Sequence, residues 1–187
     1  MLNRFFKVSM LLGTMTLGCM TGCNKDKPVW ENIFDNQLPM LGHRNWILIV
    51  DKAFPAQTSS GIEVINTESD IVTVVKVVLE KLAASDHVKP VVYTDKEFDC
   101  LTTDLVPQIT DLREQYRNMF ESFTQQSMLH ESVFARIDEA SKLFKTVVLK
   151  TDCLIPYSSV FIELDCKYWS EKSEKTLREQ MNKQQIN

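Results

Sequence analysis

The stretch that decides the fold runs from residue 41 to residue 56 and reads LGHRNWILIVDKAFPA. Its centre, residues 46–50, is continuously apolar, which is typical of a β-strand that is buried on both faces. His43 stands just before this strand, and Asp51 follows it directly. Because open α/β sheets bind small ligands at the carboxyl edge of their strands, two titratable side chains around one such strand indicate a small-molecule site.

Apolar strands and amphipathic helices continue to alternate along the rest of the chain. Further strands are expected at residues 62–65, 91–93, 146–149 and 160–164, and helices at residues 33–41, 70–84, 107–124 and 134–144. Residues 125–131 fit neither pattern. Strands that alternate with helices predict a layered α/β/α fold with a largely parallel or mixed sheet.

Residues 1–22 are predicted to be a lipoprotein signal peptide. A short basic head is followed by an apolar run that is too brief to span a bilayer, and the segment ends in small residues before a cysteine. Thr21 and Gly22 favour Cys23 over Cys19 as the site of lipid attachment. An acyl group there would tether the protein to a membrane surface. We therefore expect an exported protein of a bacterial cell envelope, with an ordinary cleaved signal peptide as the alternative.

The remaining chain is divided by composition into a lipidated tether (23–32), one domain (33–166) and a charged tail (167–187). The net charge is −4 and no basic stripe stands out, which argues against a nucleic-acid partner. No His/Cys cluster has metal-ligand spacing, so no metal site is expected. Cys100, Cys153 and Cys166 are either buried thiols, or Cys153 and Cys166 form one disulfide.

Several segments resemble the RbsD/FucU family of sugar mutarotases and pyranases, over a span from about Leu38 to Leu164. The matching segments are Gly42-His43, residues 51–56, 61–65, 69–72, 116–118 and 133–144, Thr151-Asp152 and Pro156-Tyr157. Each piece is common by itself, but their order and spacing together are specific. The resemblance implies an RbsD/FucU-like α/β domain.

The resemblance also implies an isomerase of a monosaccharide that needs neither cofactor nor metal. Exchange of sugar anomers opens a hemiacetal, in which one group takes the anomeric hydroxyl proton and another protonates the ring oxygen. A histidine can do either task near neutral pH. By resemblance, His43 is the catalytic acid/base, Asp51 and His130 bind the sugar, and Tyr157 with Ser159 closes over it.

The spacing of His43 and Asp51 bears on how such a site is assembled. The two residues are eight positions apart, which would be roughly 26 Å in an extended chain at about 3.3 Å per residue. Either the chain folds back before Trp46, or each residue serves a different site. The second option would place sites between protomers, as in the ring-shaped oligomers of the family, and we expect a homo-oligomer.

The sequence departs from the family pattern at four positions. One is Lys52, beside Asp51, where a small residue is usual and where a salt bridge could neutralise the aspartate. Asn45 stands where the family has an acid, and Ser159 where it has an asparagine. At the family's basic position one register places Val133, a second places His130, and Arg136 lies one turn further along. These departures support an alternative in which the protein is a non-catalytic lipoprotein that binds a saccharide or assembles at the envelope.

Overall fold

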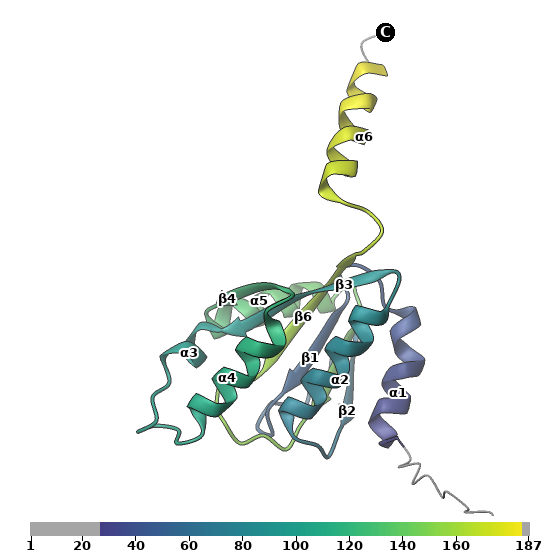
Figure 1. Ribbon diagram of the computed structural model, residues 1–187. Helices are drawn as coiled ribbons and strands as arrows, with labels where there is room; N and C mark the ends of the chain where they lie inside the picture. Colours follow the sequence, from purple (N-terminus) through teal and green to yellow (C-terminus); the bar gives the residue numbers. More distant parts are fainter. Residues whose placement is uncertain (1–26, 185–187) are drawn as a thin grey trace, which may run out of the picture.

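The structure, a computed structural model, describes residues 27–184 and is built around one six-stranded sheet. The strands are β1 (Trp46–Val50), β2 (Ile62–Asn66), β3 (Val88–Asp95), β4 (Thr124–Met128), β5 (Thr146–Lys150) and β6 (Val160–Cys166). Their order is β2-β5-β1-β6-β3-β4 (Figure 1). Only β6 runs antiparallel to its neighbours, β1 and β3. The predicted mixed sheet is confirmed, whereas the predicted signal peptide and Cys23 lie outside the described residues.

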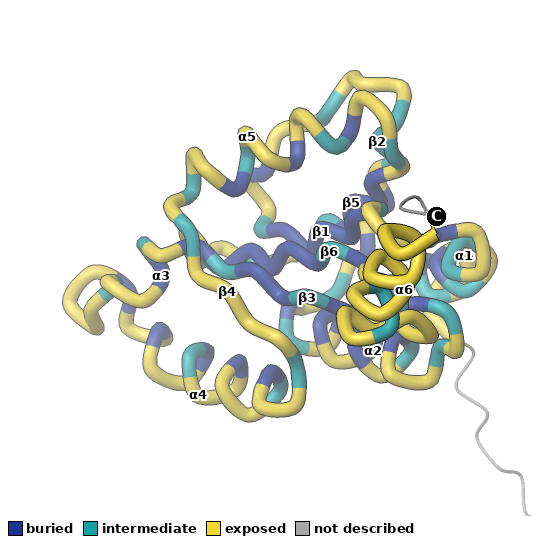
Figure 2. Tube along the Cα trace, turned by 90° about the horizontal axis from the view of Figure 1, so that it is seen from above, coloured by how far each residue is buried: buried dark blue, intermediate teal, exposed yellow. Residues whose placement is uncertain are grey.

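Helices cover both faces of the sheet, as the predicted α/β/α layering requires. They are α1 (Val29–Gln37), followed by a 3-10 turn η1 (Leu38–Met40), then α2 (Ile71–Ala84), α3 (Lys96–Cys100), α4 (Ile109–Phe120), α5 (His130–Ser141) and α6 (Glu171–Gln184). Figure 2 shows α5 on one face and α1, α2 and α4 on the other. The buried side chains accordingly form two clusters, one on each side of the sheet.

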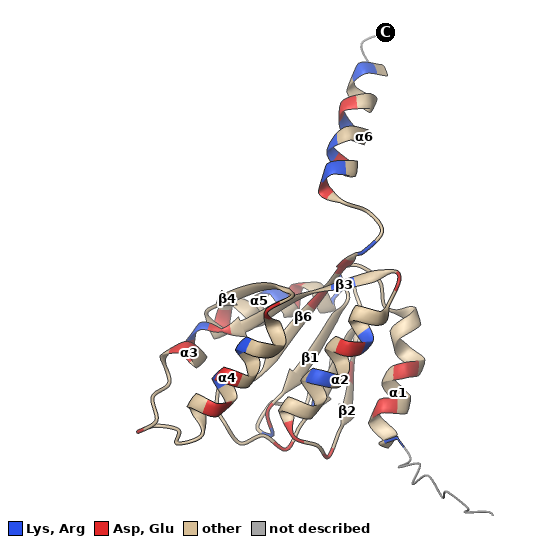
Figure 3. Cartoon of the chain, viewed as in Figure 1, with Lys and Arg blue, Asp and Glu red and all other residues tan. Residues whose placement is uncertain are grey.

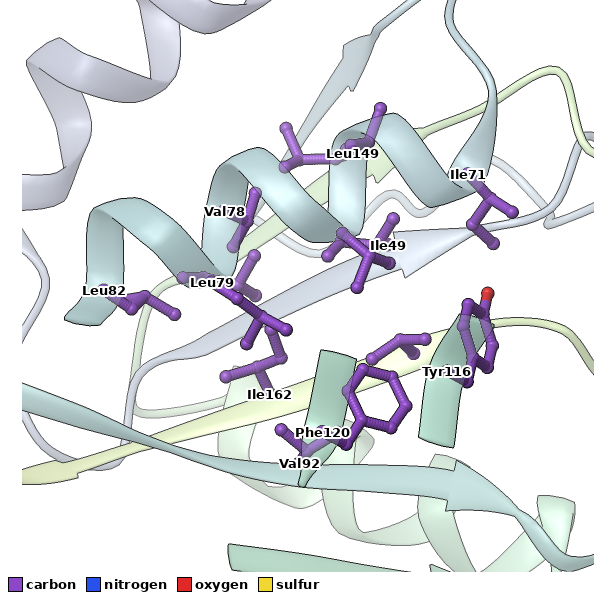
Figure 4. Close-up of a cluster of buried hydrophobic side chains, with 14 of the residues drawn as sticks. Ile49, Ile71, Val78, Leu79, Leu82, Val92, Tyr116, Phe120, Leu149 and Ile162 are labelled. Atoms are coloured by element: carbon purple, nitrogen blue, oxygen red, sulfur yellow. The ribbon is translucent and has the colours of Figure 1, made fainter. Parts of the chain in front are cut away.

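Helix α2 forms although its sequence is rich in β-branched valines. Its first turn is capped by Asp70, whose carboxylate accepts a hydrogen bond from the Thr73 backbone N–H at 2.9 Å. Six of its apolar residues are buried against the sheet and against α4 (Figure 4). Burial of one such side chain contributes roughly 1.5–3 kcal/mol, which outweighs the few tenths of a kcal/mol that each valine loses in helix propensity.

Helix α1 begins at Val29, four residues before the predicted helix start and inside the segment predicted to be a tether. Its residues Trp30 and Phe34, one turn apart, are buried in the core. Lys81 of α2 adds ion pairs to Glu31 at 3.0 Å and to Asp35 at 2.6 Å. The first helix is therefore packed onto the domain from its first turn.

Strand β3 is longer than predicted because it passes through Pro90. A proline removes one backbone donor, so it is tolerated where a strand has no neighbour on one side. Strand β4 first pairs with β3 at Val91, opposite Thr124, and Pro90 pairs only with Leu164 of β6. The predicted helix 107–124 correspondingly ends at Phe120, and residues from Thr124 onward form the edge strand β4.

The cysteines of the described residues are free thiols, so the disulfide alternative is wrong. The alternative of buried thiols is wrong as well, because Cys100 is exposed and Cys153 and Cys166 are only partly buried. Cys153 lies in the loop before β6, whereas Cys166 is the last residue of that strand, so the length of β6 separates them. Helix α6, in the charged tail, buries no residue and projects from the body (Figures 1 and 3). Within residues 27–184 we find no helix long and apolar enough to cross a membrane.

Candidate functional site

Strands β1 and β3 end at the same edge of the sheet, on either side of β6. Because β6 runs in the opposite direction, it begins at this edge, where Val160 pairs with Ile49 of β1 and with Thr94 of β3. At this edge Asp51 directly follows β1, Asp95 is the last residue of β3, and Ser159 directly precedes β6. The topology therefore brings two carboxylates to the two sides of one hydroxyl.

Asp51 and Ser159 form a hydrogen-bonded pair at this edge. The Ser159 hydroxyl donates to Oδ2 of Asp51 at 3.1 Å, and Oδ1 accepts from the Ala53 backbone N–H at 2.8 Å. The adjacent Lys52 is engaged elsewhere, because its Nζ atom lies 2.5 Å from Oδ1 of Asp152. The Asp51 carboxylate is thus fixed in place, half-buried, and is not paired with its neighbouring lysine.

His130, the first residue of α5, is held by two carboxylates. Its ring atom Nδ1 lies 2.8 Å from Oδ2 of Asp95, and its backbone N–H donates to Oε2 of Glu97 at 3.0 Å. Asp95 is fully buried, and its second oxygen, Oδ1, has no hydrogen-bond partner among the described residues. Burial raises the pKa of Asp95 to about 6, although His130 acts against this rise, and the charges of Glu97 and Asp51 add to it.

Aromatic rings line one side of this polar cluster. The Tyr157 ring meets the His130 ring edge-on at 5.3 Å between centroids, and Phe134 lies 4.6 Å from the same ring. Phe134 in turn stacks on Phe54, which follows β1, at 5.5 Å. Carboxylates and an imidazole beside aromatic rings can bind a small molecule that has both hydroxyl groups and apolar C–H faces.

The loop 151–159 that carries Tyr157 is anchored at both ends. The Thr151 hydroxyl donates to the Val50 carbonyl at 2.8 Å, and the Tyr116 hydroxyl of α4 donates to the Ser158 carbonyl at 2.7 Å. Burial raises the pKa of Tyr116, which keeps its hydroxyl protonated as a donor. Tyr157 adopts a left-handed backbone conformation, with φ of 57°, which is uncommon for a bulky residue. The loop is thus held at both ends, and Tyr157 lies between these anchors with 37% of its surface exposed.

Of the residues predicted from the sequence, the structure brings together Asp51, His130, Tyr157 and Ser159. It does not bring His43 to them, because His43 precedes β1 and Asp51 follows it, at opposite ends of that strand. His43 instead lines a cavity of about 620 Å³ near the start of α6, with Trp169 among its walls. The chain does not fold back before Trp46 in a way that would unite the two.

The three alternatives for the basic position have separate places in the structure. Val133, a residue of α5, is buried in the core. Arg136, on the same helix, donates to Glu163 of β6 at 2.8 Å. His130 is the one that faces the other site residues. At the remaining departure from the family pattern, the Asn45 side chain accepts from the Gly42 backbone N–H at 2.7 Å and donates to the Lys145 carbonyl at 3.1 Å.

Sequence reasoning missed Asp95 and Glu97. A usable signal was present, because Asp95 ends an apolar strand in the same way that Asp51 follows one. The contact between Asp95 and His130 could not be predicted from the sequence, since it joins positions 35 residues apart. In the part of the chain that the structure describes, no group of three or more His, Cys, Asp or Glu side chains could hold a metal ion.

In comparisons with known proteins, the chain matches solved structures but no family model and no curated sequence. Among solved structures, RbsD of Bacillus subtilis, complexed with D-ribose, is similar with a TM-score of 0.51 and 16% identity, over 74% of this chain and 95% of that one.

A second solved structure gives the same result. The fucose mutarotase of Streptococcus pneumoniae, in complex with L-fucose, is similar with a TM-score of 0.50 and 18% identity, over 74% of this chain and 96% of that one. Both matches cover nearly the whole of the other protein, so the similarity concerns a complete domain. The resemblance predicted from the sequence is confirmed in three dimensions, and this chain has the RbsD/FucU fold.

Proposed function

We propose that the protein is a monosaccharide mutarotase or pyranase-like isomerase that is tethered to a membrane surface by lipid. The observation that carries this proposal is the cluster of Asp51, Ser159, His130 and Tyr157 at the carboxyl edge of the sheet. The fold supports it, because the two similar structures contain D-ribose and L-fucose. Side chains of this kind match the groups that a sugar offers.

In this proposal each residue type has a chemical task. Asp51 accepts hydrogen bonds from sugar hydroxyls, and the Tyr157 ring packs on the C–H face of the sugar. One imidazole takes the proton of the anomeric hydroxyl while a second group protonates the ring oxygen, and the C–O bond of the ring breaks. Rotation about the C1–C2 bond and closure by the reverse proton transfers give the other anomer. Protons and electrons balance without a cofactor.

We propose further that a second copy of the chain supplies His43 to this site. His43 and Asp51 lie at opposite ends of β1, and a strand of five residues spans roughly 17 Å. The two cannot contact one sugar within one chain. A homo-oligomer with sites between protomers would unite His43 of one copy with Asp51 and His130 of the next.

A specific observation favours the second candidate function, a lipoprotein that binds a saccharide or assembles at the envelope without catalysis. Asn45 carries an amide in place of a carboxyl group, and its side chain is hydrogen-bonded to the backbone of Gly42 and Lys145. Because an amide does not ionise, it cannot serve His43 as an acidic partner. In this second candidate function the aromatic rings and Asp51 would still bind a sugar, but His43 would lack a neighbouring acidic side chain to orient its imidazole.

The deciding experiment is anomer exchange measured by saturation-transfer NMR. One anomeric proton of fucose, ribose, galactose or glucose is saturated in turn, and transfer to the other anomer is followed with and without protein. Transfer that rises with protein and is lost in His43→Ala and in His130→Ala supports the isomerase. The third histidine is the matched control, because His87 is bonded to Ser85 and to the Leu41 carbonyl. His87→Gln should keep the exchange. Sugar binding without exchange would favour the second candidate.

The membrane tether has its own test. Metabolic labelling with a radioactive fatty acid should mark the native protein and leave Cys23→Ala unlabelled, whereas Cys19→Ala should still be labelled. Cell fractionation should place the labelled protein in the envelope. A native protein that is secreted without label would leave the isomerase proposal standing and end the proposal of a lipid anchor.

A further inference from the structure

We propose that Asp95 is a positioning residue that fixes His130 in the tautomer with its proton on Nδ1, so that Nε2 is the nitrogen that exchanges a proton with the sugar. This inference rests on the proposed function and adds a residue to it. Asp95 lies outside the segments that resemble the family.

The geometry selects one nitrogen of His130. Nδ1 lies 2.8 Å from Oδ2 of Asp95, which is fully buried. The backbone of His130 is held separately by Glu97, and its ring is flanked by Phe134 and Tyr157. Nε2 has no hydrogen-bond partner within residues 27–184, and the side chain is 35% exposed. The ring is thus clamped on its Nδ1 side and open on its Nε2 side.

The chemistry of the pair then sets the tautomer. An ionised carboxylate only accepts hydrogen bonds, so Nδ1 must be the nitrogen that carries the proton, and Nε2 keeps its lone pair. When Nε2 takes the proton of the anomeric hydroxyl, the O–H electrons form the carbonyl of the open-chain sugar. The ring C–O bond breaks, and the ring oxygen takes a proton from the second acid. The imidazolium that results faces the Asp95 carboxylate, which stabilises its charge.

The unpartnered oxygen of Asp95 supports this role over a purely structural one. A buried carboxylate that served only to hold α5 would be expected to have both oxygens hydrogen-bonded. Here Oδ1 has no partner among the described residues, and Oδ2 is directed at a ring whose charge changes during the reaction. Asp51 and Glu97 are the other titratable groups that act on Asp95, and both are acidic. Asp95 and Glu97 both contact His130, so the imidazolium formed during turnover would lie against two carboxyl groups.

The test reads the tautomer directly. Long-range ¹H–¹⁵N correlation spectra of the purified native protein should show His130 with a proton on Nδ1 and none on Nε2, at a pH where the ring is neutral. Asp95→Asn, which is nearly the same size, should mix or reverse the two tautomers because an amide can also donate to Nδ1. Asp138→Asn is the matched control, since Asp138 is an exposed carboxyl on the same helix. It should leave the His130 signals unchanged.

The kinetic result expected for Asp95→Asn is a loss of about 100-fold in kcat with little change in KM, as for loss of a general acid/base function. The two readouts separate this inference from the proposed function. A protein that exchanges no sugar but shows the Nδ1–H tautomer, lost in Asp95→Asn, would end the isomerase proposal and support the positioning role. A native Nε2–H tautomer, or an unchanged tautomer in Asp95→Asn, would overturn the positioning role at any level of activity.

Discussion

The Ser159 hydroxyl joins the backbone and the side chain of Asp51. It accepts from the Asp51 N–H at 3.3 Å and donates to Oδ2 of the same residue at 3.1 Å. The residue that follows β1 is thereby tied to the residue that precedes β6, although the two positions are 108 residues apart. One hydroxyl group therefore fixes both the backbone and the carboxylate of Asp51.

Ser159→Ala should lower the free energy of unfolding by about 1 kcal/mol, because it leaves the half-buried Asp51 N–H without its acceptor. It should also weaken sugar binding, since Asp51 would lose its fixed orientation. Urea denaturation and sugar titration measure the two effects. Ser60→Ala, at an exposed loop position, should change neither. If Ser159→Ala alters stability but not binding, the pair serves only the fold.

Mixing two inactive variants tests whether sites lie between protomers. His43→Ala and His130→Ala should each abolish anomer exchange when pure. When the two are unfolded together and refolded as mixed oligomers, part of the exchange should return, because His130 of one copy and His43 of the other complete a native site. Sites that lie within one chain would give no recovery, since every chain in the mixture lacks one histidine.

The stability of the fold should depend on pH through Asp95. Its pKa rises from 3.8 to about 6 on folding, so between these values the folded protein binds more protons than the unfolded chain. The free energy of unfolding then falls as pH rises through this window, by up to about 3 kcal/mol at about 1.4 kcal/mol per unit. Denaturation curves from pH 4 to 7 should show this decline relative to Asp95→Asn. In Asp138→Asn the decline should remain as in the native protein.

Gly61 tolerates no side chain for reasons of space. A Cβ atom there would lie 2.4 Å from the Ser141 carbonyl oxygen, and Gly61 also accepts a hydrogen bond from Thr146 at 2.9 Å. Gly61→Ala should therefore lower the urea midpoint, with a loss of about 1–3 kcal/mol or more as β2 and α5 move apart. Gly42→Ala is the matched control, because the nearest atom would be 4.0 Å away. Equal midpoints for the two variants would contradict this packing.

Much of the fold was predictable because its pattern is local. The run 46–50 predicted a doubly buried strand, and β1 is buried throughout. Asp70 and the apolar spacing after it predicted α2 and its cap. The first helix was predicted at residues 33–41, but its start at Val29 was not, because the burial of Trp30 and Phe34 depends on contacts with distant segments. Strand β4 was missed because its exposed, polar sequence carries no apolar period.

The site was predictable only in part, for a related reason. Asp51, Tyr157 and Ser159 flank strands, so their edge of the sheet followed from the sequence. His130 could not be chosen over Val133 without knowing where α5 begins, which is at the limit of what residue patterns resolve. The Asp95 contact with His130 depends on tertiary structure, because it forms only when β3 and α5 are in place.

The reversed direction of β6 determines where the sequence could vary without disturbing the sheet. Strands β5 and β6 are not neighbours, so the loop 151–159 must cross the end of β1 to connect them. One short connection therefore lies over the place where β1 ends. Hydrogen bonds hold it to the residue that follows β1, where the Lys52 N–H donates to the Cys153 carbonyl at 2.8 Å, and to α4 through Tyr116. Insertions or substitutions within this span would reshape what the protein recognises while every strand pairing stayed as it is.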